Sequence, residues 1–208
     1  MDMFALKQAN LSGKKILDCP AGACSFTAVG SAHGHDITAC DIAYYHPVDQ
    51  LKEKGFLDIE HVMYHMEKAK SNYDWDYFGD VDGLNQHRVN ALKACAEHME
   101  HSPEKYIPVT LPVLPFTDDE FDILLSAHFL FMYSDRLDFD FHRETMDELL
   151  RVTKEEIRIF PLVDLAGKRY EQLDELINYL QQKGCITEER KADYHFQRNA
   201  NTILRIIK

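Results

Sequence analysis

Short apolar runs alternate with amphipathic stretches along most of the chain. Ile16–Leu17 and Ile37–Cys40 are two such runs, and Phe121–Tyr133 (FDILLSAHFLFMY) is almost unbroken, as in a central strand covered on both faces. Arg143–Thr153 and Tyr170–Gly184 carry apolar residues at helical spacing, and the second stretch ends at a glycine. This alternation of strands and helices predicts an α/β fold with a mostly parallel sheet.

The two ends of the chain carry weaker patterns. Residues 1–13 predict a short lead-in helix. Near the other end, Ala192–Arg198 and Asn201–Ile207 alternate or run apolar on either side of Asn199. These two stretches predict a terminal antiparallel β-hairpin that closes the sheet.

The connection between the second strand and the next strand signal, at Tyr106, is unusually long. Residues from about 47 to 105 contain two helical patterns, Leu57–Lys70 and His87–Glu100. A crossover between neighbouring strands needs only one helix. We therefore expect a helical insertion within a single domain that spans residues 1–208.

An aromatic cluster lies in the middle of this insertion. It consists of Tyr73, Trp75, Tyr77 and Phe78. Two interpretations stay open: the cluster lines a ligand pocket, or it forms the insertion's own small core. In the first case the insertion acts as a lid that excludes water from the site.

Composition narrows the classes of function. The 208 residues carry a formal net charge of −12 and no cluster of Lys and Arg, which disfavours binding to nucleic acid. Five cysteines without paired spacing indicate free thiols in a reducing cytoplasm. No apolar run approaches the roughly 18 residues of a membrane span, and no signal peptide is recognisable, so we expect a cytoplasmic protein without a membrane partner. The histidine pairs lack accompanying carboxylates or thiols at metal spacing, so no metal site is expected, and no pattern indicates an oligomeric state.

Residues Ile16–Asp41 hold the strongest functional signal. An apolar run leads to Asp18, a small-residue turn (CPAGAC), an amphipathic stretch and a second apolar run that ends on Asp41. This order of strand, turn, helix, strand and acid suits a nucleotide-type cofactor, since the turn brings backbone N–H groups close and the final carboxylate accepts ribose hydroxyls. Gly22 stands almost alone, however, and missing glycines argue against a bound pyrophosphate.

The turn resembles the first motif of the class I, Rossmann-like S-adenosylmethionine (SAM) methyltransferases, which usually reads D/E-x-G-x-G-x-G. Asp18 matches the acid and Gly22 the middle glycine, while Pro20 and Cys24 replace the outer glycines. Leu114–Phe131 resembles the family's segment entering the fourth strand. Glu148–Phe160 resembles the helix and fifth strand that follow. The resemblance implies a mostly parallel seven-stranded sheet with a C-terminal antiparallel hairpin, and SAM-dependent methyl transfer to a small molecule.

The resemblance also implies roles for individual residues. Asp41 would bind the ribose hydroxyls, although an Asp there also caps turns. Ile42 would lie against the adenine ring. The remaining predicted cofactor contacts are Asp18, Pro20, Ala21 and Gly22 in the turn, Thr110 and Leu111 after the third strand, and Ser126 in the fourth.

His128 is the predicted catalytic residue. It follows the fourth strand, and ligands of open α/β sheets bind beyond the carboxyl ends of the strands. A histidine with its ordinary pKa near neutrality suits a general base that takes a proton from the methyl acceptor. A purely structural, hydrogen-bonded histidine is the alternative.

Two rival functions remain. A non-catalytic protein that binds SAM or a nucleoside would keep the same turn and acid. A nicotinamide-dependent oxidoreductase would share the sheet, but the incomplete glycine pattern and the terminal hairpin disfavour it. The absence of an N/D-P-P-Y segment argues against methylation of nucleic-acid bases.

Overall fold

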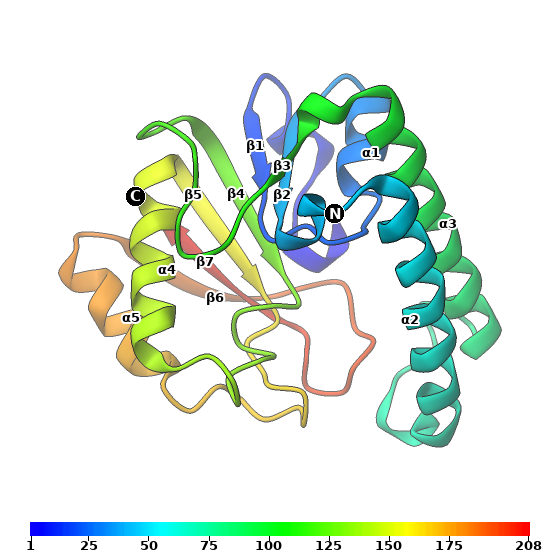
Figure 1. Cartoon of the computed structure of the whole chain (residues 1–208). Coiled ribbons are helices and arrows are strands. Elements are labelled where there is room, and N and C mark those ends of the chain that lie inside the picture. The colour runs from blue at the N-terminus through cyan, green and yellow to red at the C-terminus, as the bar shows by residue number, and fades with distance from the viewer.

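A seven-stranded sheet forms the centre of the computed structural model, which describes all residues 1–208 (Figure 1). The spatial order is β3-β2-β1-β4-β5-β7-β6. Strands β1 to β5 run parallel, β7 pairs antiparallel with β5, and β6 pairs antiparallel with β7. This arrangement confirms the predicted fold class. The strands are β1 (Lys15–Asp18), β2 (Asp36–Asp41), β3 (Tyr106–Pro108), β4 (Phe121–Ala127), β5 (Thr153–Phe160), β6 (Ile186–Lys191) and β7 (Thr202–Ile207).

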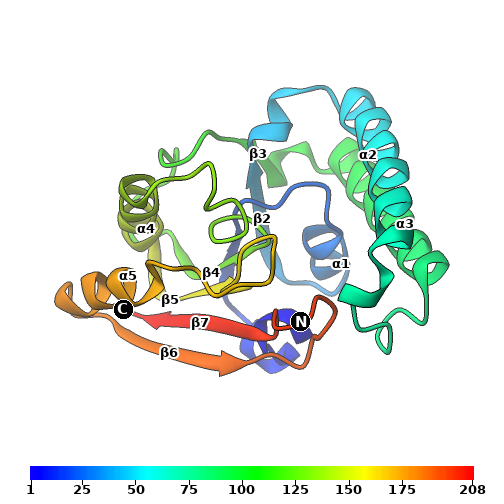
Figure 2. The ribbon, with the colours of Figure 1, turned by 90° about the horizontal axis from the view of Figure 1, so that it is seen from below.

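Helices cover both faces of the sheet, as the view in Figure 2 shows. Helices α4 and α5 pack on one face. The N-terminal segment, α1 and α3 pack on the other. Their bounds are α1 (Phe26–Ala32), α2 (Val48–Lys68), α3 (Val81–His101), α4 (Phe139–Val152) and α5 (Leu173–Gln182).

Strand β4 shows why its sequence is apolar without interruption. Successive side chains of a strand point to opposite faces. Leu124 packs with Met146 and Leu149 of α4, whereas Leu125 packs with Leu11 of the N-terminal segment, and each of these side chains is at most 2% exposed. A strand buried on both faces needs apolar residues at every position.

The predicted helical insertion is confirmed and consists of α2 and α3. Helix α3 contacts α1 and lies against the β2–β3 edge, where Leu92, Cys95 and Met99 are buried with Tyr106. Helix α2 packs along α3. Both helices run past the carboxyl ends of the parallel strands (Figure 1).

The predicted lead-in helix is wrong. The segment forms two 3₁₀ turns, Asp2–Phe4 and Gln8–Asn10. The buried residues Phe4, Leu6 and Leu11 have no common helical spacing. The carbonyls of Phe4 and Ala5 accept hydrogen bonds from the buried Arg158 side chain, at 2.8 and 2.9 Å, and therefore need no helical donor.

The terminal hairpin is present, but its first strand lies earlier than predicted. Ile186–Lys191 forms β6, whereas residues 192–198 belong to the loop that leads to β7. The loop backbone pairs instead with the α2–α3 turn, since Asp74 N–H donates to the Phe196 carbonyl at 2.7 Å and Tyr73 bridges to Gln197. The apolar pattern does not indicate strand β6, because β6 is an edge strand of mostly charged residues (ITEERK).

Candidate functional site

Asp18 ends β1 and opens the turn that leads to α1. Its carboxyl group is buried, with the residue 4% exposed, and Oδ2 accepts a hydrogen bond from the Cys24 thiol at 3.3 Å. No Lys, Arg or His forms an ion pair with it. Burial raises the pKa of Asp18 to about 7, and the neighbouring Asp41 charge adds to this rise. The turn therefore encloses an acid whose negative charge has no cationic partner.

Asp41 ends β2 and holds the turn in place. Its Oδ2 accepts from Gly22 N–H and its Oδ1 from Ala43 N–H, each at 2.8 Å. The Tyr44 hydroxyl donates to the Gly22 carbonyl at 2.7 Å. Asp41 thus caps the following turn, as one sequence interpretation held. Each carboxylate oxygen still keeps a lone pair for a further hydroxyl donor.

The surface beside Asp41 is open and partly apolar. Gly22 has φ +58°, and a Cβ added there would meet no atom within 4 Å. Ile42, the residue after Asp41, is 61% exposed. Pro20 and Ala21 are half-buried, and Ala21 N–H donates to the carbonyl of Cys40 at the end of β2. The predicted turn contacts therefore converge on Asp41.

The third strand ends next to Asp41. Pro108 of β3 is in register with Asp41, and Val109 N–H donates to the Asp41 carbonyl at 3.2 Å. Thr110 follows, exposed, and Leu111 is half-buried. This register places Thr110 and Leu111, two of the predicted cofactor contacts, on the same sheet edge as Asp41 and Ile42.

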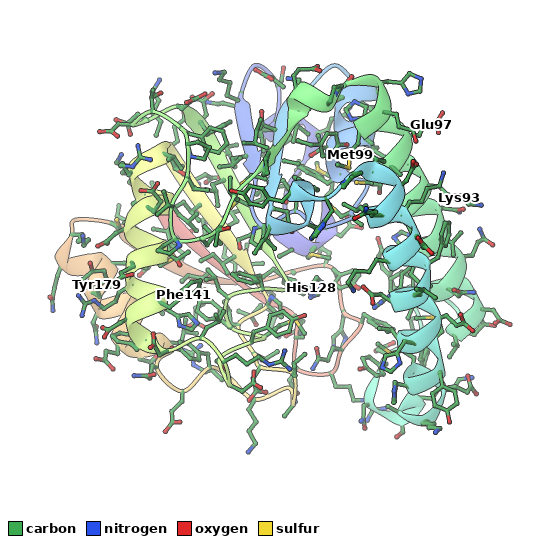
Figure 3. All side chains as sticks on the ribbon, in the orientation of Figure 1. Lys93, Glu97, Met99, His128, Phe141 and Tyr179 are labelled. Atoms are coloured by element: carbon green, nitrogen blue, oxygen red, sulfur yellow. The ribbon has the colours of Figure 1, made fainter.

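Ser126 and His128 stand at the end of β4. The Ser126 hydroxyl is buried and has no hydrogen-bond partner. His128 lies two residues further on, with a backbone φ of +55°. The backbone N–H of His128 donates to the Phe160 carbonyl at 2.7 Å. In Figure 3 the labelled His128 lies beyond the strand ends, between the α4–α5 and α2–α3 pairs. His128 therefore lies at the carboxyl edge of the sheet, between these two helix pairs.

His128 differs from the expected histidine in its acidity. The imidazole keeps a solvent-exposed surface, and Nδ1 lies 3.3 Å from Met132 Sδ. The surrounding protein desolvates the charged ring and, with the positive charge of Arg88, lowers the pKa of His128 to about 4. A lowered pKa favours the neutral ring at pH 7 and makes it a weaker base than an ordinary histidine, so the role of His128 as a general base stays a prediction.

The aromatic cluster of the insertion forms a core shared with the loop between β6 and β7. Tyr73 stacks on Phe196 with ring centroids 4.8 Å apart, and Phe78 meets the same ring at 5.0 Å. Tyr77 meets Tyr194 at 5.0 Å. The cluster is therefore neither a free pocket wall nor the insertion's own core. Any movement of the α2–α3 turn as a lid has to carry this loop with it.

One charged residue escaped the sequence analysis. Arg88 lies on α3 between the buried Leu84 and Leu92, at the four-residue spacing that repeats on one helix face. Its side chain is half-buried, and desolvation lowers its pKa. The sequence does contain a signal for this residue: Arg88 occupies an inward position in an otherwise apolar stripe of the helix.

Neither a metal cluster nor a membrane helix occurs in the structure. No three His, Cys, Asp or Glu side chains lie close enough to hold a metal ion. No helix has the length and apolar character needed to cross a membrane. All five cysteines are free thiols.

Comparison with known proteins gives one strong sequence relative. The chain is 38% identical over 203 residues to the uncharacterized protein MJ0045 of Methanocaldococcus jannaschii, covering 97% of this chain and 89% of that protein. The chain belongs to the MJ0045 family. No protein-family profile matches the sequence.

Several solved structures with the same fold are methyltransferases of low sequence identity. A SAM-dependent methyltransferase from Aquifex aeolicus is 12% identical, with a TM-score of 0.50, over 99% of this chain and 90% of that one. Magnesium protoporphyrin IX methyltransferase from Synechocystis with bound SAM is 10% identical, with a TM-score of 0.53, over 96% and 72%. The 1,6-didemethyltoxoflavin-N1-methyltransferase of Burkholderia thailandensis is 14% identical, with a TM-score of 0.52, over 96% and 75%. The chain has the Rossmann-like fold of the class I SAM-dependent methyltransferases.

Proposed function

We propose that this protein binds SAM at the carboxyl ends of β1 and β2 and transfers its methyl group to a small molecule. The observation that carries the proposal is the pair of acids at this edge. Asp41 has lone pairs free for two ribose hydroxyls, and the buried Asp18 carboxyl lacks a cation. SAM brings a ribose, an ammonium group and a sulfonium charge, so its donors and charges match both acids.

The residues around this pair also fit the cofactor. The open space at Gly22 admits a ligand close to the backbone, and the exposed Ile42 offers an apolar contact for an adenine ring. When bound, the cofactor supplies a methyl group that its sulfonium charge already activates. The buried Asp18 disfavours the nicotinamide alternative, because a diphosphate near its carboxylate would meet like charge.

The protein's own contribution to methyl transfer is mainly positioning. Holding an acceptor in line with the methyl group removes much of the entropic barrier. His128 is neutral at pH 7 and accepts a hydrogen bond from a donor group of the acceptor. We assign His128 this orienting role first, and proton removal only for acceptors that are themselves acidic.

The net charge and the free thiols support a small-molecule acceptor and a cytoplasmic location. A net charge of −12 opposes a polyanionic acceptor, which favours a small molecule over DNA or RNA. The five free thiols suit a reducing cytoplasm. A non-catalytic SAM-binding role is the second candidate, and transfer of a radioactive methyl group to any small molecule would eliminate it.

A Gly22→Val substitution tests the location of the cofactor. The valine side chain would project into the open space beside Asp41, so we expect binding of S-adenosylhomocysteine, the demethylated cofactor, to fall at least about 30-fold in calorimetry. Part of any loss in stability comes from the left-handed backbone at φ +58°, which a β-branched residue adopts poorly.

Gly34→Val is the matched control. Gly34 has φ +78° and equally open surroundings, but it lies in the turn that precedes β2, at the amino end of the parallel strands. The control should lose similar stability and retain affinity. Equal affinities of the two variants for S-adenosylhomocysteine would place the cofactor elsewhere.

A further inference from the structure

The half-buried Arg88 guanidinium has no anionic partner. Arg88 and Arg198 are the arginines without a carboxylate within ion-pair distance, and Arg198 is exposed to solvent. No side-chain or backbone oxygen accepts a hydrogen bond from Arg88 either. Removing a cation from water without a partner is costly, so such groups usually have a counter-charge. Within this chain, that counter-charge is missing.

The part of α3 that carries Arg88 packs on aromatic rings: the ring of the adjacent His87 lies 5.2 Å from Phe78, and Phe78 lies 6.2 Å from Tyr194, measured between ring centroids. Tyr194 and Tyr73 are the ionisable groups that bear on the pKa of Arg88, and neither Asp18 nor Asp41 is among them. The positive charge of Arg88 also lowers the pKa of His128. Tyr194 and His128 also pack on the same ring, Phe160, with centroids 5.7 and 5.3 Å away. Arg88 therefore belongs to the His128 side of the carboxyl edge.

We place Arg88 beside His128 rather than at the proposed cofactor position. The acids that suit the cofactor stand at the ends of β1 and β2, whereas His128 follows β4. An arginine forks two parallel N–H groups toward a carboxylate and also stacks on aromatic faces. The half-buried Tyr194 ring provides such a face in its vicinity.

We propose that Arg88 selects the methyl acceptor by pairing with its carboxylate, and that the acceptor is an aromatic carboxylic acid. The inference rests on the proposed methyltransferase function and adds the substrate class. The neutral His128 imidazole then remains free to accept a hydrogen bond from a hydroxyl or amine of the same molecule. A neutral acceptor of the same shape would leave Arg88 unpaired and bind more weakly.

Matched pairs of small probes test this inference. Benzoate, 4-hydroxybenzoate and indole-3-acetate are titrated by NMR or calorimetry against their neutral amides, with and without saturating S-adenosylhomocysteine. We expect at least one carboxylate to bind about tenfold or more tightly than its amide to the wild-type protein. Arg88→Gln should abolish that difference, and Arg88→Lys should restore part of it.

Lys93→Gln is the matched control for charge. Lys93 lies on the same helix but is exposed on its outer side, whereas Met99 faces inward (Figure 3). This variant removes one positive charge from α3 and should keep the wild-type preference. Thermal unfolding of both variants checks that they fold.

Three results would overturn the assignment. They are no preference for any carboxylate in the wild-type protein, an unchanged preference in Arg88→Gln, or a tenfold loss of S-adenosylhomocysteine affinity in Arg88→Gln. The last result would mean that Arg88 pairs with the carboxylate of the cofactor and not with that of the acceptor. A wild-type protein that fails to bind S-adenosylhomocysteine would reject the proposed function instead, while the titrations without it still decide whether Arg88 binds a carboxylate.

Discussion

Replacing Asp41 by alanine is expected to weaken S-adenosylhomocysteine binding by about 100-fold. The substitution removes two contributions at once. It deletes the acceptors for the ribose hydroxyls, and it releases the N–H groups of Gly22 and Ala43 that fix the turn at 2.8 Å each. Charge-assisted hydrogen bonds contribute about 1.5–3 kcal/mol, and roughly 2.7 kcal/mol corresponds to 100-fold in affinity. Isothermal titration calorimetry measures the change directly.

The matched control for this substitution is Asp36→Ala. Asp36 begins the same strand, and its side chain is 49% exposed and paired with Lys105 on the surface. Surface ion pairs contribute little, so both stability and affinity should stay near the wild-type values. An Asp41→Ala protein that is folded and binds as tightly as the control would remove Asp41 from the site.

Asp18→Asn is expected to stabilise the free protein at pH 8. The pKa of Asp18 is about 7 in the folded protein and lies near its model value of 3.8 in the unfolded chain. The folded state therefore holds the proton more tightly, and wild-type stability falls as the pH rises from about 4 to about 7 and stays low above that. Removing the charge should raise the free energy of unfolding at pH 8 on the order of 2–4 kcal/mol.

Urea unfolding at pH 8 and at pH 4 tests the sign of this effect. The difference between Asp18→Asn and the wild-type protein should be largest at pH 8 and should nearly vanish at pH 4. Asp193→Asn, an exposed position without hydrogen bonds, should show no such difference at either pH. A destabilised Asp18→Asn protein at pH 8 would mean that the buried acid already has a compensating partner.

The proposed binding at this edge of the sheet comes at a cost in stability. A buried carboxyl without a cation destabilises the empty protein, and acids with perturbed pKa values concentrate at functional sites.

A cationic ligand beside Asp18 would lower the pKa of Asp18 and so favour its ionised form. Affinity for S-adenosylhomocysteine should therefore rise several-fold between pH 6 and pH 7.5 in the wild-type protein and stay flat in Asp18→Asn.

The parts of the fold that could be predicted from the sequence are those where the burial of apolar residues dominates. The β1–α1–β2 unit follows from two apolar runs around a small-residue turn, and β4 follows from an apolar run buried on both faces. The order of these elements predicted a mostly parallel sheet, and the closing hairpin was predicted with its first strand too late in the chain. Asp18, Gly22 and Asp41 come together because parallel strands all end at one edge.

The remaining features depend on contacts between distant segments. Strand β6 is mostly charged because it lies at the sheet edge, and the apolar alternation around Tyr194 and Phe196 reflects packing on the α2–α3 turn. The lowered pKa of His128 depends on desolvation by distant segments and on the charge of Arg88, forty residues earlier in the chain. Local periodicity carries no information on such partners.

Titration of the unmodified protein with S-adenosylhomocysteine, followed by the same titration with NADH, tests the central claim most directly. We expect one S-adenosylhomocysteine bound per chain with a micromolar or tighter dissociation constant, and no heat of binding from NADH. Slower hydrogen exchange of the Gly22 and Ala43 backbone amides in the same complex would locate the ligand at Asp41. Binding of NADH without binding of S-adenosylhomocysteine would contradict the account and assign this edge of the sheet to a dinucleotide.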